Sequence, residues 1–224
     1  MDPRLHCELR LIPSPDTDFE PIDPWVEVRL TIESGGVYER LLVWQGLLYH
    51  LGDWFVDSAE ALCNGELDIE GERPLPGENL AEALDRIRDR AFLETDEDSE
   101  LRWFDAIYEY QEPHSLMNFL PGARIPDIVL GCHRGAGEIS LSTRRYELMD
   151  YAENPLPDDV YVKEGRWSRR FDMRAFLDEL RAQLERTLSE WLAGDRDPSA
   201  RPAKEKLLQR LPSVPCGDCC GDAG

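Results

Sequence analysis

The sequence predicts an α+β domain, a mostly antiparallel sheet packed by about three helices, followed by a flexible C-terminal tail. In some segments apolar residues alternate with polar ones, as in half-buried strands, and in others they recur every three or four residues, as in helices. The chain has 224 residues, 42% of them hydrophobic, which is enough for one sizeable core. We place the domain at residues 1–194 and the tail at 195–224, because prolines recur after Gly194.

The first strands are predicted near the N-terminus. "LHCELRLI" at 5–12 and "WVEVRLTIE" at 25–33 alternate apolar and polar side chains. "SGG" at 34–36 precedes "VYERLLVW" at 37–44, which predicts a hairpin. Further short strands are predicted in "LRWFDAIYEY" (101–110), "IPDIVLGCH" (125–133), "EISLSTRR" (138–145) and "DVYVKEG" (159–165). Between two of them, "GCHRGAG" at 131–137 is typical of a hairpin turn rather than a phosphate-binding loop.

Three helices of some length are predicted from apolar stripes. The first begins near Leu47 and ends near Gly65. The second, 80–91, follows Asn79 and Glu82, whose spacing is that of a capping box. The third, 173–194, is capped by Asp172 and ended by Gly194. A short helix is predicted within "PAKEKLLQRL" at 202–211, and the acidic "ETDEDSE" at 94–100 is predicted to be an exposed loop.

Acidic residues dominate the charge of the chain. There are 46 Asp and Glu against 25 Lys and Arg, a formal net charge of -21, and the surplus lies within residues 1–194. Such a surface repels phosphate backbones and anionic lipids, so direct binding of nucleic acid or membranes is disfavoured. A basic protein partner would be attracted. The alternative interpretation is that the acidity only keeps the protein soluble.

Two acidic stretches are the candidate partner-binding surface. The leading hypothesis is a non-enzymatic intracellular interaction protein that binds a basic partner through them, with association steered by charge. In size and charge alone, the chain resembles small intracellular immunity or antitoxin-like inhibitors of bacterial toxins, which implies an inhibitory role. The candidate residues are Asp57, Glu60, Glu66, Asp68, Glu70, Glu94, Asp96, Glu97, Asp98 and Glu100.

An arginine cluster stands out in this acidic chain. Arg166, Arg169 and Arg170 lie near Trp167 and Phe171, and guanidinium groups beside aromatic rings can bind a carboxylate or a phosphate. They are the candidate anion-binding residues. The alternative is that they form ordinary surface ion pairs with neighbouring acids.

The C-terminal cysteines suggest a second function, that of a metal-binding protein or small metalloenzyme. Cys216, Cys219 and Cys220 provide a CxxC spacing that suits zinc, but a structural zinc site needs four ligands. A second pair of ligands would have to come from elsewhere. The His-Cys pair at 6–7 and the Cys-His pair at 132–133 are candidates, but neighbours on a strand point to opposite faces, so at most one residue of each pair could reach a shared site. The alternatives are an unstructured tail, or cysteines used for redox chemistry or covalent attachment.

No motif identifies an enzyme. The chain contains no GxSxG, no GxxxxGK[ST] and no HExxH sequence. A site assembled in space from scattered carboxylates and the four histidines His6, His50, His114 and His133 is a third hypothesis. With no transmembrane segment or signal peptide evident, we predict a cytoplasmic protein, and the sequence does not specify its oligomeric state.

Overall fold

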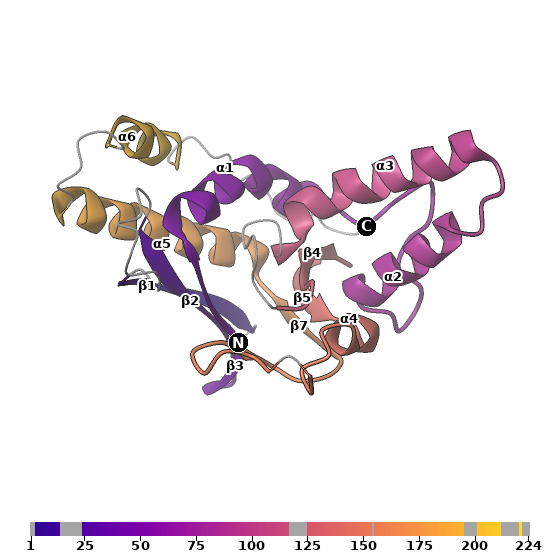
Figure 1. Cartoon of the computed structure of the whole chain (residues 1–224), viewed down its shortest axis with the longest axis horizontal. Coiled ribbons are helices and arrows are strands. Elements are labelled where there is room, and N and C mark those ends of the chain that lie inside the picture. The colour runs from indigo at the N-terminus through magenta and orange to yellow at the C-terminus, as the bar shows by residue number, and fades with distance from the viewer. Residues whose placement is uncertain are drawn as a thin grey trace.

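The computed structural model describes residues 3–13, 24–116, 125–153, 155–194, 201–211 and 220. These residues form six helices and seven strands in two antiparallel sheets, which confirms the predicted α+β class (Figure 1). The strands are β1 (Arg4–Ile12), β2 (Trp25–Ser34), β3 (Val37–Leu47), β4 (Val129–His133), β5 (Ala136–Leu141), β6 (Tyr161–Val162) and β7 (Trp167–Phe171). The helices are α1 (Leu48–Asn64), α2 (Leu80–Ala91), α3 (Glu97–His114), α4 (Thr143–Glu147), α5 (Met173–Gly194) and α6 (Arg201–Arg210).

The larger sheet has the strand order β1-β2-β3-β6. Its first strand buries Leu5, Cys7 and Leu9 on one face, as the alternating sequence predicts, and α5 packs on this strand. Gly35 and Gly36 join β2 to β3 with positive φ angles of 60° and 80°, a conformation that suits glycine. The predicted N-terminal hairpin is therefore confirmed.

The smaller sheet has the order β4-β5-β7. The β4–β5 hairpin turns at Arg134 and Gly135, which both have positive φ angles. This confirms that the glycine-rich segment 131–137 is a hairpin turn.

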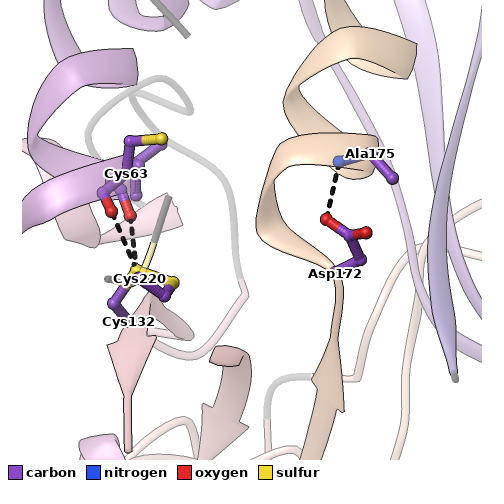
Figure 2. Close-up of a disulfide and its surroundings, with 6 residues drawn as sticks. Cys63, Cys132, Asp172, Ala175 and Cys220 are labelled. Carbon is purple, nitrogen blue, oxygen red and sulfur yellow. Dashed lines mark hydrogen bonds between the residues drawn. A yellow bond between two sulfur atoms is a disulfide. The ribbon is translucent and has the colours of Figure 1, made fainter. Parts of the chain in front are cut away.

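The predicted helix signals lie at the observed helix ends. Asn79 accepts a hydrogen bond from the Glu82 backbone N–H at 2.9 Å, and the Glu82 side chain accepts one in return from the Asn79 N–H. Asp172 Oδ1 accepts from the Ala175 N–H at 3.0 Å at the start of α5 (Figure 2). These contacts satisfy backbone donors that a helix leaves unpaired at its first turn.

Residues 101–110 are a helix, so the strand predicted there is wrong. They belong to α3, which begins at Glu97 after the N-cap Asp96. The predicted loop at 94–100 therefore ends at Asp96, four residues earlier than expected. The aromatic content that suggested a strand has helical spacing instead, because Trp103, Ile107 and Tyr110 fall on one side and pack against α2.

Two hydrophobic clusters form the core. The larger one joins both sheets to α1 and α5, and the smaller one lies mainly between α2 and α3. Leu207 and Leu211, at the predicted short helix, are buried in the larger cluster, as is Cys220. The described parts of the C-terminal segment are thus packed against the domain, and the boundary near residue 195 stays a prediction.

A buried arginine joins the smaller cluster to the second sheet. Arg145 of α4 donates from Nε to Asp85 Oδ1 at 2.7 Å and from Nη1 to Asp127 Oδ2. Ser142 donates to the other oxygen of Asp85, and Gln111 of α3 donates to Asp127 at 3.2 Å. The network therefore links α2, α3 and α4 around a side chain that is only 3% exposed.

We expect the substitution Arg145→Met to lower the free energy of unfolding by about 3–5 kcal/mol, because it leaves Asp85 and Asp127 without their cation. Urea denaturation measures this loss. Arg144→Met is the matched control: Arg144 pairs with Asp89 in solvent, and its loss should cost no more than about 1 kcal/mol. Equal losses in the two variants would contradict the importance of the buried network.

Candidate functional site

Helix α1 has one buried face and one acidic outer face. Leu48, Leu51 and Phe55 are buried in the larger core cluster. Asp53 and Asp57 stand four residues apart, so their carboxylates lie one turn apart on the outer face. The packing of the apolar stripe therefore fixes which acids face outward.

A recess of about 560 Å³ lies along this outer face of α1. Its other residues come from the last turns of α3, which contacts α1. Its lining includes four carboxylates and the aromatic side chains of a tyrosine and a tryptophan, so it is both acidic and partly aromatic. These residues are Asp53, Asp57, Glu109, Glu112, Tyr49 and Trp54.

A second recess, of about 340 Å³, adjoins the first along α3. Glu109 lines both of them. The second recess adds Glu70, Asp98 and Asp105, together with Arg102 and Leu101. We call the residues that line the two recesses the acidic groove. Seven carboxylate side chains line this groove, which gives it a strongly negative field.

The helical spacing of α3 explains why its acids gather in the groove. Asp98, Asp105 and Glu109 are separated by seven and four residues, the repeat of one helix face, while Trp103 and Ile107 occupy the buried face. Because the packing of Trp103 and Ile107 fixes the rotation of α3, its acidic side chains stay on the face that shares a recess with the acids of α1. The fold thus holds these like charges together.

Arginines already contact the groove. Arg210 of α6 donates from Nη1 to Asp53 Oδ1 at 2.8 Å and from Nη2 to Asp57 Oδ1 at 2.7 Å. Arg102 lies 3.4 Å from a Glu70 oxygen. The contact of Arg210 with two carboxylates shows that the α1 side of the groove accommodates a guanidinium group.

The structure brings three of the ten predicted partner-binding acids together. Asp57, Glu70 and Asp98 line the acidic groove. The other seven lie outside its lining. They are Glu60 exposed on α1, Glu66 in a separate recess, Asp68 paired with Arg73, Glu94 near Arg90, Asp96 as the α3 cap, and Glu97 and Glu100 in the first turn of α3.

Four groove acids were missed by the sequence reasoning. Asp105, Glu109 and Glu112 lie in or just after the segment predicted as a strand, where alternate residues would face opposite sides. Asp53 lies in a correctly predicted helix. The spacing of four residues between Asp53 and Asp57 could have indicated that both lie on one helix face. On α3 the corresponding signal was the spacing of seven, four and three residues between Asp98, Asp105, Glu109 and Glu112.

The three predicted anion-binding arginines do not form one site of free guanidinium groups. Arg166 donates to both carboxylate oxygens of Glu82, and Arg169 donates to both oxygens of Glu39. The hydrogen bond from Arg169 lowers the pKa of Glu39 to about 2. Arg170 lines a recess of about 480 Å³ beside Cys220. An anion at Arg166 or Arg169 would have to displace a carboxylate, so anion binding there stays a prediction.

The C-terminal cysteine cluster is tied to the domain by a disulfide. Cys220 is bonded to Cys132 of β4 (Figure 2). The backbone N–H of Cys220 donates to the Cys63 carbonyl at 2.7 Å. Cys63 is itself disulfide-bonded, whereas Cys7 is a buried free thiol whose pKa is raised by burial. In this oxidised state Cys220 has no thiolate to offer zinc, so the predicted metal site would need the reduced protein. Cys216 and Cys219 lie outside the described residues.

The four histidines occupy separate environments. His6 lies between Glu33 and Glu179, and His50 lines the acidic groove. His133 Nδ1 lies 2.8 Å from Glu138 Oε2, in a buried pair. Glu138 also accepts from the backbone N–H of Leu80 at the start of α2, which gives this pair a structural role. Within the described part of the chain, no three His, Cys, Asp or Glu side chains are grouped as a metal ion requires.

His114, at the end of α3, is buried and neutral. Burial lowers its pKa from 6.5 to about 4, although Nδ1 contacts the Tyr110 carbonyl at 2.7 Å and the ring stacks on that of Tyr110. The unfolded chain would take up a proton at this residue as the pH falls through 6.5. The folded chain takes it up only near pH 4.

We therefore expect His114 to destabilise the fold as the pH falls from about 6.5 to 4, by roughly 3 kcal/mol over that window. Chemical denaturation at a series of pH values measures the dependence. The His114→Gln variant should lose this part of the slope. The same slope in wild type and His114→Gln would refute the assignment.

Of the helices that the structure describes, none combines the length and apolar composition needed to cross a lipid bilayer. No protein-family model, curated protein or solved structure matches this chain.

The acidic groove therefore has to be interpreted from its own residues and geometry.

Proposed function

We propose that the protein binds a basic protein partner, and that it does so through the acidic groove between α1 and α3. The single observation that carries this proposal is the concentration of carboxylates there. Seven acids from α1, α3 and the segment between α1 and α2 line two adjoining recesses. Such a surface complements Lys and Arg side chains on a partner.

The contact of Arg210 supports guanidinium as the group that the groove recognises. Its two terminal nitrogens reach separate carboxylates on successive turns of α1. Tyr49 and Trp54 line the same recess, and aromatic faces attract cations as well. An arginine from a partner would meet the same set of groups.

Exposed apolar side chains beside the groove provide contact area. Leu101 and Tyr108 of α3 are 61% and 67% exposed. Interfaces combine charge, which governs approach and orientation, with buried apolar anchors, which supply most of the affinity. The partner is therefore expected to present basic residues flanked by apolar ones. By covering a cationic surface that the partner needs for binding an anion, the protein would act as an inhibitor.

The cytoplasmic location inferred from the sequence stays a prediction, and the disulfide bears on it. Disulfides persist in oxidising compartments and are rare in the reducing cytosol. A cytoplasmic protein would hold Cys132 and Cys220 mostly as thiols, whereas an oxidising compartment would preserve the bond that the structure shows. The redox environment therefore decides which form of the C-terminal segment meets the partner.

The proposal predicts that a labelled polyarginine peptide binds the protein through the groove. In the double variant Asp105→Asn/Glu109→Gln we expect the Kd for the peptide to rise roughly fivefold to tenfold at low ionic strength, because two exposed carboxylates are lost. Fluorescence anisotropy measures the Kd. Added salt should weaken binding to the wild type, because salt screens exposed charges.

The double variant Glu147→Gln/Glu153→Gln is the matched control. It removes the same charge from exposed positions on α4 and in the turn that follows, outside the groove. We expect it to change the Kd less than twofold. Equal weakening by the two double variants would show that only the total charge matters, and salt-independent binding would contradict an electrostatic interface.

A further inference from the structure

The C-terminal helix α6 places a cation where the proposed partner would bind. Arg210 bridges Asp53 and Asp57, two of the carboxylates that line the larger recess. The arginine side chain is 36% exposed, and the two carboxylates are 41% and 65% exposed. Ion pairs this exposed to solvent are weak, so a partner with several cations can displace Arg210.

Helix α6 packs against both α5 and α1. It has ten residues, too short for a helix that is stable alone. Leu207 and Leu211 are buried in the core, and Lys204 lies over the Trp191 ring of α5. Most of the remaining side chains of α6 are exposed. The helix is therefore a small, largely polar element. In the described residues, Leu207, Leu208 and the following Leu211 hold it against the core, together with the buried Lys204 and the ion pairs of Arg210.

The disulfide closes the chain beyond α6. Cys220 is bonded to Cys132 and hydrogen-bonded to Cys63, at the end of the same helix α1 that carries Asp53 and Asp57. Cys220 is thus attached to the domain by a covalent bond, and α6 is attached by the packing of Leu207 and Leu211. Such attachment raises the effective concentration of Arg210 at the groove, and cutting the bond at residue 220 lowers it.

Cys220 also adopts a conformation that a non-glycine residue rarely takes. Its φ angle is +54°, in the left-handed region. Both cysteines are buried, Cys132 at 1% and Cys220 at 7% exposure, but each lines a recess, of about 250 Å³ at Cys132 and about 480 Å³ at Cys220. Backbone strain at Cys220 favours cleavage of the bond, and the recess that Cys220 lines is the route by which a small thiol would reach it.

We propose that α6 is an autoinhibitory cover of the acidic groove, in which Arg210 stands in for an arginine of the partner, and that the Cys132–Cys220 disulfide keeps this cover closed until a dithiol reduces it. This proposal rests on the proposed function of the groove. It assigns the disulfide a regulatory role in addition to its structural one.

The redox step is a thiol–disulfide exchange with a dithiol reductant. One thiolate of the reductant attacks one sulfur of the disulfide, forms a mixed disulfide with that cysteine, and releases the other cysteine as a thiolate that takes a proton from water. The second thiol of the reductant loses its proton and attacks the mixed disulfide, which releases the remaining cysteine. The protein gains two electrons and two protons, and the reductant leaves as a disulfide.

The test compares binding of the polyarginine peptide to oxidised and dithiothreitol-reduced protein at low ionic strength. We expect the reduced wild type and the oxidised Arg210→Ala variant to bind about fivefold more tightly than the oxidised wild type, because each loses the internal competitor. Reduction of Arg210→Ala should add little, since both changes act through one contact. Arg186→Ala is the matched control, because it removes an exposed arginine of α5 that lies near Glu190.

A second variant isolates the bond, since dithiothreitol also reduces the disulfide of Cys63. The Cys132→Ala/Cys220→Ala variant keeps the disulfide of Cys63 and should bind the peptide more tightly than the oxidised wild type does, with circular dichroism confirming its fold. If it binds as the oxidised wild type does, the Cys132–Cys220 bond is not the latch. Equal affinities for Arg210→Ala and Arg186→Ala would overturn the cover itself while leaving the proposed function intact.

Hydrogen exchange separates failure of the cover from failure of the proposed function. Amide exchange in residues 201–211 should be faster in the reduced than in the oxidised protein, and this readout needs no partner. If no form binds the peptide but exchange still responds to reduction, the proposed function fails and the latch remains. Unchanged exchange on reduction would refute the latch whatever the peptide does.

Discussion

The buried ion network around Arg145 is the constraint on which the shape of the acidic groove depends. Burying a guanidinium group costs free energy unless carboxylates pair with it, and Arg145 pairs with Asp85 on α2 and with Asp127 before β4. Gln111 of α3 joins the same network through Asp127. The position of α3, and with it one wall of the groove, is therefore set by the polar contact of Gln111 with this network as well as by apolar packing.

Helix α1 uses one face for packing in the core and the other face for the carboxylates of the groove. The apolar stripe of α1 holds the helix on the sheet, and the residues between its members have to face solvent. Because α3 packs beside α1 with its own acids outward, repulsion between the two rows is built into the fold. Arg210 neutralises part of that repulsion from within the chain. Stability and partner binding are thus coupled at Asp53 and Asp57.

Local patterns predicted most of the fold, and non-local contacts account for what they missed. The hairpin at Gly35 and the capped helices at Asn79 and Asp172 depend on neighbouring residues, so their signals were readable. Helix α3 was missed because aromatic and β-branched residues favour strands locally, whereas packing on α2 selected the helical spacing. The groove and the Cys132–Cys220 bond join segments far apart in sequence, which no local spacing reveals.

The sequence separation of 88 residues between Cys132 and Cys220 has a consequence for the unfolded chain. Closing so long a loop removes many conformations from the unfolded ensemble, a stabilisation of about 4–5 kcal/mol in the chain-entropy account. Most of that effect is independent of contacts in the folded state. Molecules with the Cys132–Cys220 disulfide would therefore unfold less often, and be cleaved by proteases more slowly, than molecules in which it is reduced. The redox conditions that a molecule has met would thus set how long it persists.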